Sequence, residues 1–217
     1  MTSQHFILSD GEEIPLILET RRGARNIILR PKTIPRREIH ISVPRWTLTS
    51  QALKFLEQKR GWIEKVFMRA PQKIKIQDGD IIVIFGQEVV VSRANLGGAP
   101  EFLERRLRDK IKEMFLAHAK EIINEVPITL RPAKICIRDT TSRWGSCSST
   151  GTISLSWRLA FAPPEVMRYV IMHELSHRKY MDHSPAFWAQ VSKLHGDGVG
   201  RAKLWLSKNG AELHKYF

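Results

Sequence analysis

This chain of 217 residues is poor in cysteine, and it has no apolar run of the length that a transmembrane helix needs. Its two cysteines, Cys136 and Cys147, are too few for the disulfide framework of a small secreted domain. The first five residues, MTSQH, lack the basic segment and following apolar segment of a secretory leader. We therefore expect a cytoplasmic protein with reduced thiols and no membrane partner.

Acidic residues are scarce beside basic ones, 22 against 35, so the formal net charge is +13. An excess of this size favours polyanionic partners, nucleic acid above all. The basic residues are spread along the chain, however, and we find no helix-turn-helix, zinc-finger or RNA-recognition signature. A nucleic-acid partner is therefore one interpretation of the charge, and a generally basic enzyme without such a partner is the other.

The most informative stretch is HELSH, from His173 to His177. On a helix, two histidines four residues apart share one face and can bind the same tetrahedral metal ion. Glu174 follows the first histidine, where it can reach a metal-bound water without being a ligand itself. The preceding helix is rich in apolar residues: Val166, Met167, Val170 and Ile171. Solvated histidines would be out of place on such a buried helix, so a metal site is the better interpretation.

A third histidine, His183, follows ten residues after His173, the offset of the metzincin pattern HExxHxxGxxH. Tyr180 stands where that pattern has glycine, so the chain must turn in another way. We expect Met181-Asp182 to make the turn, because aspartate favours turn geometry. Ser184-Pro185 then predicts the N-cap and the first position of another helix.

Three histidine ligands suit zinc, and they leave the fourth position open, which is the catalytic pattern rather than the structural one. The cofactor that we expect is therefore Zn²⁺, with His183 as the third ligand. A remote carboxylate is the alternative third ligand. Glu212 is the plausible glutamate downstream, and Asp182 and Asp197 are less suitable.

Hydrophobic periodicity predicts an α+β protein. Short strands are expected over residues 13–19, 26–30, 38–43, 81–85, 88–92, 133–139 and 152–157. Helices are expected over residues 51–69, 100–124, 184–195 and 200–209, and from Pro163-Pro164 through the HELSH motif. The glycine-rich stretch at 96–100 is the best linker. We therefore predict a β-rich N-terminal part at 1–95, packed on a metal-binding catalytic domain at 96–217.

Several segments together resemble the bacterial YgjP-like metal-dependent hydrolases. They are RWGSC at 143–147, Ile153-Ser154-Leu155, Pro163-Pro164, the HELSH motif and HSPAFW at 183–188. That family is grouped with gluzincin-like peptidases and is related to SprT-like proteins. The resemblance implies a zincin-like α+β fold with an HExxH helix. It also implies zinc on His173, His177 and His183, with Glu174 as base.

Arg143 and Tyr180 are further candidates for contact with a substrate or a transition state. Arg143 precedes the strand at 152–157, and in a zincin such a strand can border the cleft. The structural alternative has Arg143 paired with a carboxylate, Trp144 in the core and Gly145 in a bulge. Tyr180 is equally compatible with simple packing.

Zinc-dependent hydrolysis of peptide bonds is the function that this pattern favours, with Glu174 as the general base that activates zinc-bound water. Two alternatives stay open. One is metal-dependent hydrolysis of a phosphate-containing small molecule such as a nucleotide, to which the basic charge would contribute. The other is a nucleic-acid-associated basic protein whose peptidase acts on bound partners.

Overall fold

The protein is described by a computed structural model, which covers residues 4–33, 36–71 and 73–217. Residues 1–3, part of the segment on which the leader prediction rests, lie outside this range. Contacts between residues divide the chain into two units, Met1–Pro71 and Gln72–Phe217. The sequence instead suggested a boundary near residue 95, and that boundary and the packing of the N-terminal part stay predictions.

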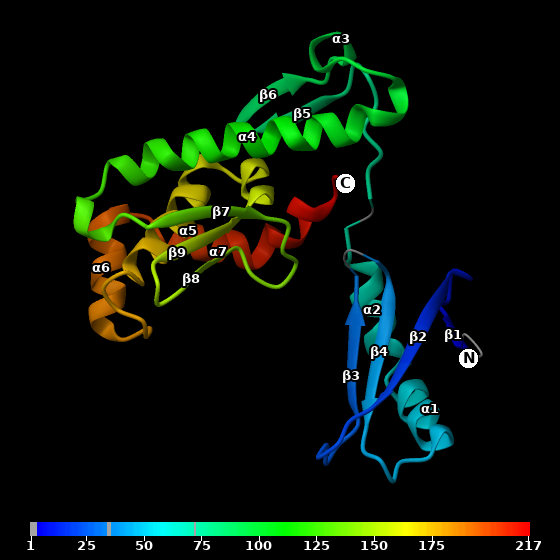
Figure 1. Ribbon diagram of the computed structural model, residues 1–217. Helices are drawn as coiled ribbons and strands as arrows, with labels where there is room; N and C mark the ends of the chain where they lie inside the picture. The colour runs from blue at the N-terminus through cyan, green and yellow to red at the C-terminus, as the bar shows by residue number, and fades with distance from the viewer. Residues whose placement is uncertain (1–3, 34–35, 72) are drawn as a thin grey trace. The chain divides into compact units, whose positions relative to one another are not determined.

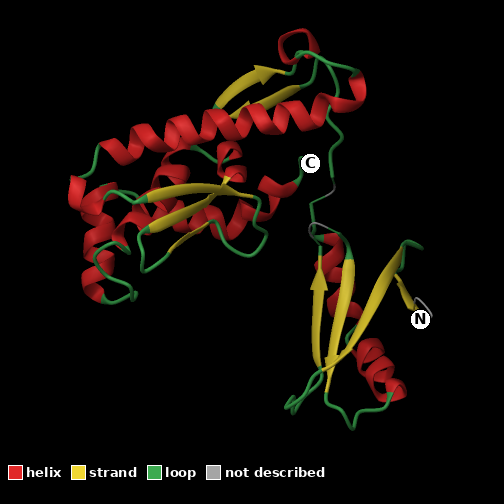
Figure 2. Ribbon diagram, in the orientation of Figure 1, coloured by secondary structure: helices red, strands yellow, loops and turns green. Residues whose placement is uncertain are grey.

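The N-terminal unit is a sheet of order β1-β2-β4-β3 with two helices on one face (Figure 2). Its elements are β1 (Gln4–Ile7), β2 (Glu13–Thr20), β3 (Ile28–Lys32), β4 (Glu38–Val43), α1 (Thr49–Gln58) and α2 (Arg60–Met68). The core forms because β4 buries Ile39, Ile41 and Val43 at every second position. The two helices supply the apolar side chains that cover this face.

The sequence predicted one helix over residues 51–69, and this prediction was wrong in one respect. The structure has two helices, which meet at Lys59. Lys59 interrupts the apolar stripe at the point where a continuous helix would bury it. Each shorter helix buries its own pair of core residues instead: Ala52 and Leu56 in α1, and Ile63 and Phe67 in α2.

The second unit contains the remaining elements (Figure 1). They are β5 (Ile81–Ile84), β6 (Gln87–Val90), α3 (Arg93–Leu96), α4 (Leu103–Asn124), β7 (Lys134–Arg138), β8 (Gly145–Cys147), β9 (Thr152–Ser156), α5 (Pro164–Ser176), α6 (Pro185–His195) and α7 (Val199–Asn209), with four short 3-10 helices, η1 (Pro100–Phe102), η2 (Ile128–Leu130), η3 (Trp157–Phe161) and η4 (Gly210–His214). A three-stranded sheet has the order β7-β9-β8, in which β7 is parallel and β8 antiparallel to β9. The predicted α+β class is confirmed.

The core of this unit joins α4, the sheet and α5. Along α4, Leu107, Ile111, Phe115 and Ala119 follow one another at intervals of four residues, and all are buried. From β9, Ile153 and Leu155 are buried on the face that packs against α5. The sheet therefore supports the helix that carries the HELSH motif.

The β5–β6 hairpin turns one residue earlier than the sequence suggested. The turn residues are Phe85 and Gly86, rather than Gly86 and Gln87, and both have positive φ, 52° and 76°. Positive φ at both turn positions matches the twist of a hairpin, but it is uncommon for phenylalanine. The Phe85 ring stacks on Phe115 with ring centroids 6.5 Å apart, so packing stabilises the unfavourable position.

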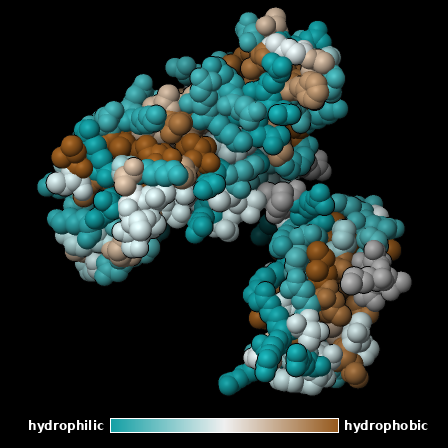
Figure 3. Space-filling model, viewed as in Figure 1, coloured by the Kyte–Doolittle hydropathy of each residue, from teal (hydrophilic) through white to brown (hydrophobic). Residues whose placement is uncertain are grey.

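Most of the visible surface of both units is hydrophilic, and hydrophobic side chains gather in the second unit between α4 and β7 (Figure 3). Among the described residues, no helix combines the length and the hydrophobicity that a membrane span needs.

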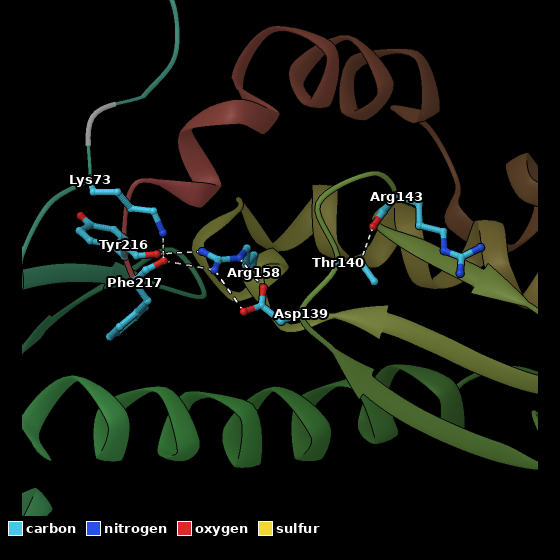
Figure 4. Close-up of polar contacts among 7 residues, drawn as sticks. All are labelled: Lys73, Asp139, Thr140, Arg143, Arg158, Tyr216 and Phe217. Atoms are coloured by element: carbon cyan, nitrogen blue, oxygen red, sulfur yellow. Dashed lines mark hydrogen bonds and ion pairs between the residues drawn. The ribbon is translucent and has the colours of Figure 1, made fainter. Parts of the chain in front are cut away.

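A buried arginine joins the C-terminal segment to the sheet. Arg158 in η3 is 3% exposed, and its guanidinium donates to both carboxylate oxygens of Asp139, at 2.7 and 3.2 Å. The same group donates to the backbone carbonyls of Tyr216 at 2.8 Å and Phe217 at 3.4 Å, and Lys73 also donates to the Phe217 carbonyl (Figure 4). Burial alone would raise the pKa of Asp139, and the hydrogen bonds from Arg158 reverse this shift and lower it.

Asp139→Asn should destabilise the second unit by about 2–4 kcal/mol, because it leaves the buried Arg158 cation without its counter-ion. Urea denaturation would measure the loss in the free energy of unfolding. The matched control is Asp109→Asn, since Asp109 pairs with Lys112 at 3.9 Å on the exposed face of α4. That change should cost less than about 0.5 kcal/mol. Equal effects of the two substitutions would contradict the account.

Candidate metal centre and active site

The HELSH motif lies in the last turn of α5 and just beyond it. Pro164 occupies the first turn, where proline is tolerated because its missing N–H would have no helical partner. His173 and Glu174 lie inside the helix, and His177 is its C-cap residue. The chain then bends at Met181 and Asp182, as predicted.

Three histidine rings converge at this point. The Nε2 atoms of His173 and His183 are 3.2 Å apart. One ring nitrogen from each of His173, His177 and His183 lies within 4.8 Å of the others. Two nitrogens that bind one tetrahedral zinc at the usual bond length are separated by ~3.3 Å. Among the described residues this is the group of ligand atoms that fits a metal ion, and Glu212, Asp182 and Asp197 are not part of it.

The protonation states of the histidines suit metal binding. Burial, with smaller contributions from His177, His183 and Lys203, lowers the pKa of His173 to about 4. Burial also lowers the pKa of His177, against the effect of a hydrogen bond to the Tyr180 carbonyl. Neutral imidazoles have a free lone pair at neutral pH, and a metal ion needs one from each ligand.

The Tyr180 backbone also decides which nitrogen of His177 is available. The Nδ1 atom of His177 lies 3.0 Å from the Tyr180 carbonyl oxygen, which can only accept a hydrogen bond. Nδ1 therefore carries the proton, and the lone pair lies on Nε2. In His173, Nδ1 is buried and has no hydrogen-bond partner among the described residues, while Nε2 faces His183.

The start of α6 holds the third histidine. Ser184 is the N-cap residue and accepts a hydrogen bond from the Phe187 N–H at 3.4 Å, with Pro185 in the first position, as predicted. The fully buried Phe187 ring packs against the three histidine rings, with centroid distances of 4.9, 4.5 and 4.8 Å for His173, His177 and His183. This apolar contact restricts how the rings turn and shields them from water on one side.

Glu174 is 5% exposed and lies against Gly145 in β8. A Cβ atom at position 145 would be 2.5 Å from Glu174 Oε1 and 2.6 Å from its Cγ. Gly145 has no positive φ, so glycine is needed here for space rather than for backbone conformation. Burial raises the pKa of Glu174 to about 7, although the Arg143 charge opposes the shift. A cation held by the histidines would lower this pKa again.

The other candidates, Arg143 and Tyr180, are not among the convergent ligand atoms. Arg143 is exposed, and its positive charge acts to lower the pKa of Glu174. Its backbone carbonyl accepts a hydrogen bond from the Thr140 hydroxyl at 2.7 Å (Figure 4). Tyr180 contributes its carbonyl to His177, and its ring packs partly on the core. A substrate contact for either side chain stays a prediction. Cys147 is a free thiol, and burial raises its pKa, so it is a poor nucleophile.

Sequence reasoning missed the cavity beside Glu174. Its walls include Trp144, which was assigned only to the core, and Lys203 from α7. Trp144 also contacts η4, where its ring packs on that of His214 with the ring centroids 5.3 Å apart. The RWGSC stretch gave a partial signal for Trp144. No sequence signal pointed to Lys203, because nothing near it in the chain distinguishes it from the other basic residues.

One known family model matches most of the chain. The YgjP-like, metallopeptidase domain matches residues 25–209, which include the histidine cluster and Glu174. Among solved structures, the metallopeptidase zymogen abylysin of Pyrococcus abyssi is 31% identical, over 48% of this chain and 97% of that one, with a TM-score of 0.35. The zymogen jannalysin of Methanocaldococcus jannaschii is 24% identical, over 42% and 94%, with a TM-score of 0.36. Among curated proteins, none matches. The family match lends no support to the predicted nucleic-acid partner.

Gly145→Ala should destabilise the protein by about 1–3 kcal/mol, because the added methyl group overlaps the Glu174 side chain. In a Glu174→Ala background the same substitution should cost less than about 0.5 kcal/mol. Urea denaturation of the four chains, with a chelator present throughout, would measure this coupling. Gly200→Ala is the control, since a Cβ at position 200 meets nothing within 4 Å. Additive effects at positions 145 and 174 would contradict the packing described.

Proposed function

Because the chain belongs to the YgjP-like metallopeptidase family, we propose that it hydrolyses peptide bonds with one zinc ion held by its three convergent histidines. The ligands would be the Nε2 atoms of His173, His177 and His183. The observation that carries the proposal is the 3.2 Å separation of two of these atoms. Two ring nitrogens so close, together with a His173 ring that burial keeps neutral at neutral pH, suit a shared cation between them.

Imidazole donors support zinc over the harder cations. Magnesium and calcium prefer oxygen ligands, and the cluster offers nitrogen alone. When bound, zinc would polarise a substrate carbonyl and lower the pKa of a water molecule.

Glu174 is the general base in this proposal. One of its carboxylate oxygens takes a proton from the attacking water, and the same group then gives a proton to the leaving amine. Burial raises the pKa of Glu174, and the charge of the bound cation would lower it again, so that the carboxylate form is present at neutral pH to accept the proton. Gly145 leaves the space in which the carboxylate lies, and Phe187 keeps the adjacent rings in place and water away.

Metal content gives the first test. The wild-type chain should bind one zinc ion, and His183→Ala should weaken the binding by more than about 100-fold, since loss of an outer partner alone typically costs 10–100-fold. Mass spectrometry of metals after dialysis against buffered zinc would measure the stoichiometry. His118→Ala, at a half-buried position of α4 outside the histidine cluster, is the control and should keep its zinc. Unchanged zinc binding by His183→Ala would contradict the ligand assignment.

Glu174→Gln should retain zinc and lower the rate of peptide hydrolysis by about 10²–10⁴-fold, because the amide cannot accept the proton. Incubation with an unbiased peptide library, followed by mass spectrometry of the products, would measure the rate and identify the bonds that are cut. Glu165→Gln, in the exposed first turn of the same helix, is the matched control and should be fully active. Full activity of Glu174→Gln would rule out this mechanism.

A further inference from the structure

A cavity of about 250 Å³ opens beside His173 and Glu174. It lies between α5, the start of β8 and α7, and its apolar walls come from Trp144, Val170 and Leu206. Cavities that bind whole small molecules usually measure about 300–1,000 Å³, so this one suits a single side chain or chain end. Because the proposed base lines the cavity, a group bound there would belong to a residue next to the reacting bond.

One cation lines this largely apolar cavity. Lys203 extends from α7, and its Nζ atom lies 4.7 Å from the centroid of the Trp188 ring. No ion pair within residues 4–33, 36–71 and 73–217 includes Lys203. Its charge also contributes, after burial and the two other histidines, to the lowered pKa of His173. The ammonium group is therefore close to the site and has no carboxylate partner there.

The carboxylate that does line the cavity is on another wall. Glu174 lies against Gly145, on the side formed by β8, whereas Lys203 comes from α7. The space between them is bordered by apolar and aromatic side chains, and the exposed Lys203 borders it from the solvent side. A ligand with a short apolar stem and a terminal carboxylate would match both the walls and the cation.

We propose that Lys203 is a specificity-determining residue, which selects substrates that place a carboxylate in this cavity next to the scissile bond. The inference rests on the proposed peptidase function. Two sources supply the same chemistry: the side chain of an aspartate or glutamate, or the free C-terminal carboxylate of the peptide. Methylene groups of the ligand would contact Trp144 and Leu206, and its carboxylate would accept hydrogen bonds from the Lys203 ammonium.

Lys203→Glu tests the proposal by reversing the charge. The probe is a peptide library in two forms, one with free and one with amidated C-termini, and the measurement is kcat/KM for each cleaved sequence. The wild-type enzyme should favour cleavage next to a carboxylate by about 10-fold or more. In Lys203→Glu this preference should disappear, and cleavage next to lysine or arginine should rise. Lys208→Glu is the control, because it makes the same charge change on an exposed part of α7 and should keep the wild-type preference.

The two library forms identify the source of the carboxylate. Cleavage beside internal aspartate or glutamate in amidated peptides would assign the site to a side chain. Cleavage at a constant distance from a free C-terminus, lost on amidation, would assign it to the chain end. Cleavage with no carboxylate preference, or a preference unchanged in Lys203→Glu, would overturn the inference and leave the proposed function intact. No cleavage of any peptide by the zinc-loaded wild type would overturn both.

Discussion

The candidate site depends on the burial of the last turn of α5. That helix contacts α6, α7, β8 and β9, so adjacent residues on it face different neighbours. His173 meets the ring of Phe187 from α6, while Glu174 meets the backbone of Gly145 in β8. The histidine is thereby directed to the other two histidines and the carboxylate to the strand. A short motif becomes an ordered site because tight packing leaves each side chain little freedom.

The same burial determines the charges of the site. Removal from water disfavours the charged form of every group, so the pKa of His173 falls and that of Glu174 rises. Neutral histidines can bind a metal ion, and the charge of that ion would lower the raised pKa of the neighbouring carboxyl group. Arg143 and Lys203 add positive charge at the edges, where solvent stabilises it. The basic composition, for which a nucleic-acid partner was one of two interpretations, thus includes cations at the edge of the candidate site.

Sequence patterns predicted elements that depend on neighbouring residues. The N-cap at Ser184, the bend at Met181-Asp182 and the helix through the HELSH motif all follow from local geometry. The features that escaped prediction include the break at Lys59, the positive φ at Phe85 and the short strand β8. The last two are stabilised by contacts with residues farther along the chain: Phe85 stacks on Phe115, and β8 pairs with β9. The propensity of a residue for helix or strand does not by itself predict such contacts.

By itself, the sequence determined the α+β class and the placement of His173 and His177 on one helix face, because a helix brings residues four apart onto one face wherever it occurs. Only the tertiary structure decided that His183 folds back to 3.2 Å from His173, that Gly145 makes room for Glu174 and that Lys203 lines the cavity. These residues are separated by 10 to about 30 positions in the chain. Their approach requires the packing of whole elements around a common core, which no local pattern encodes.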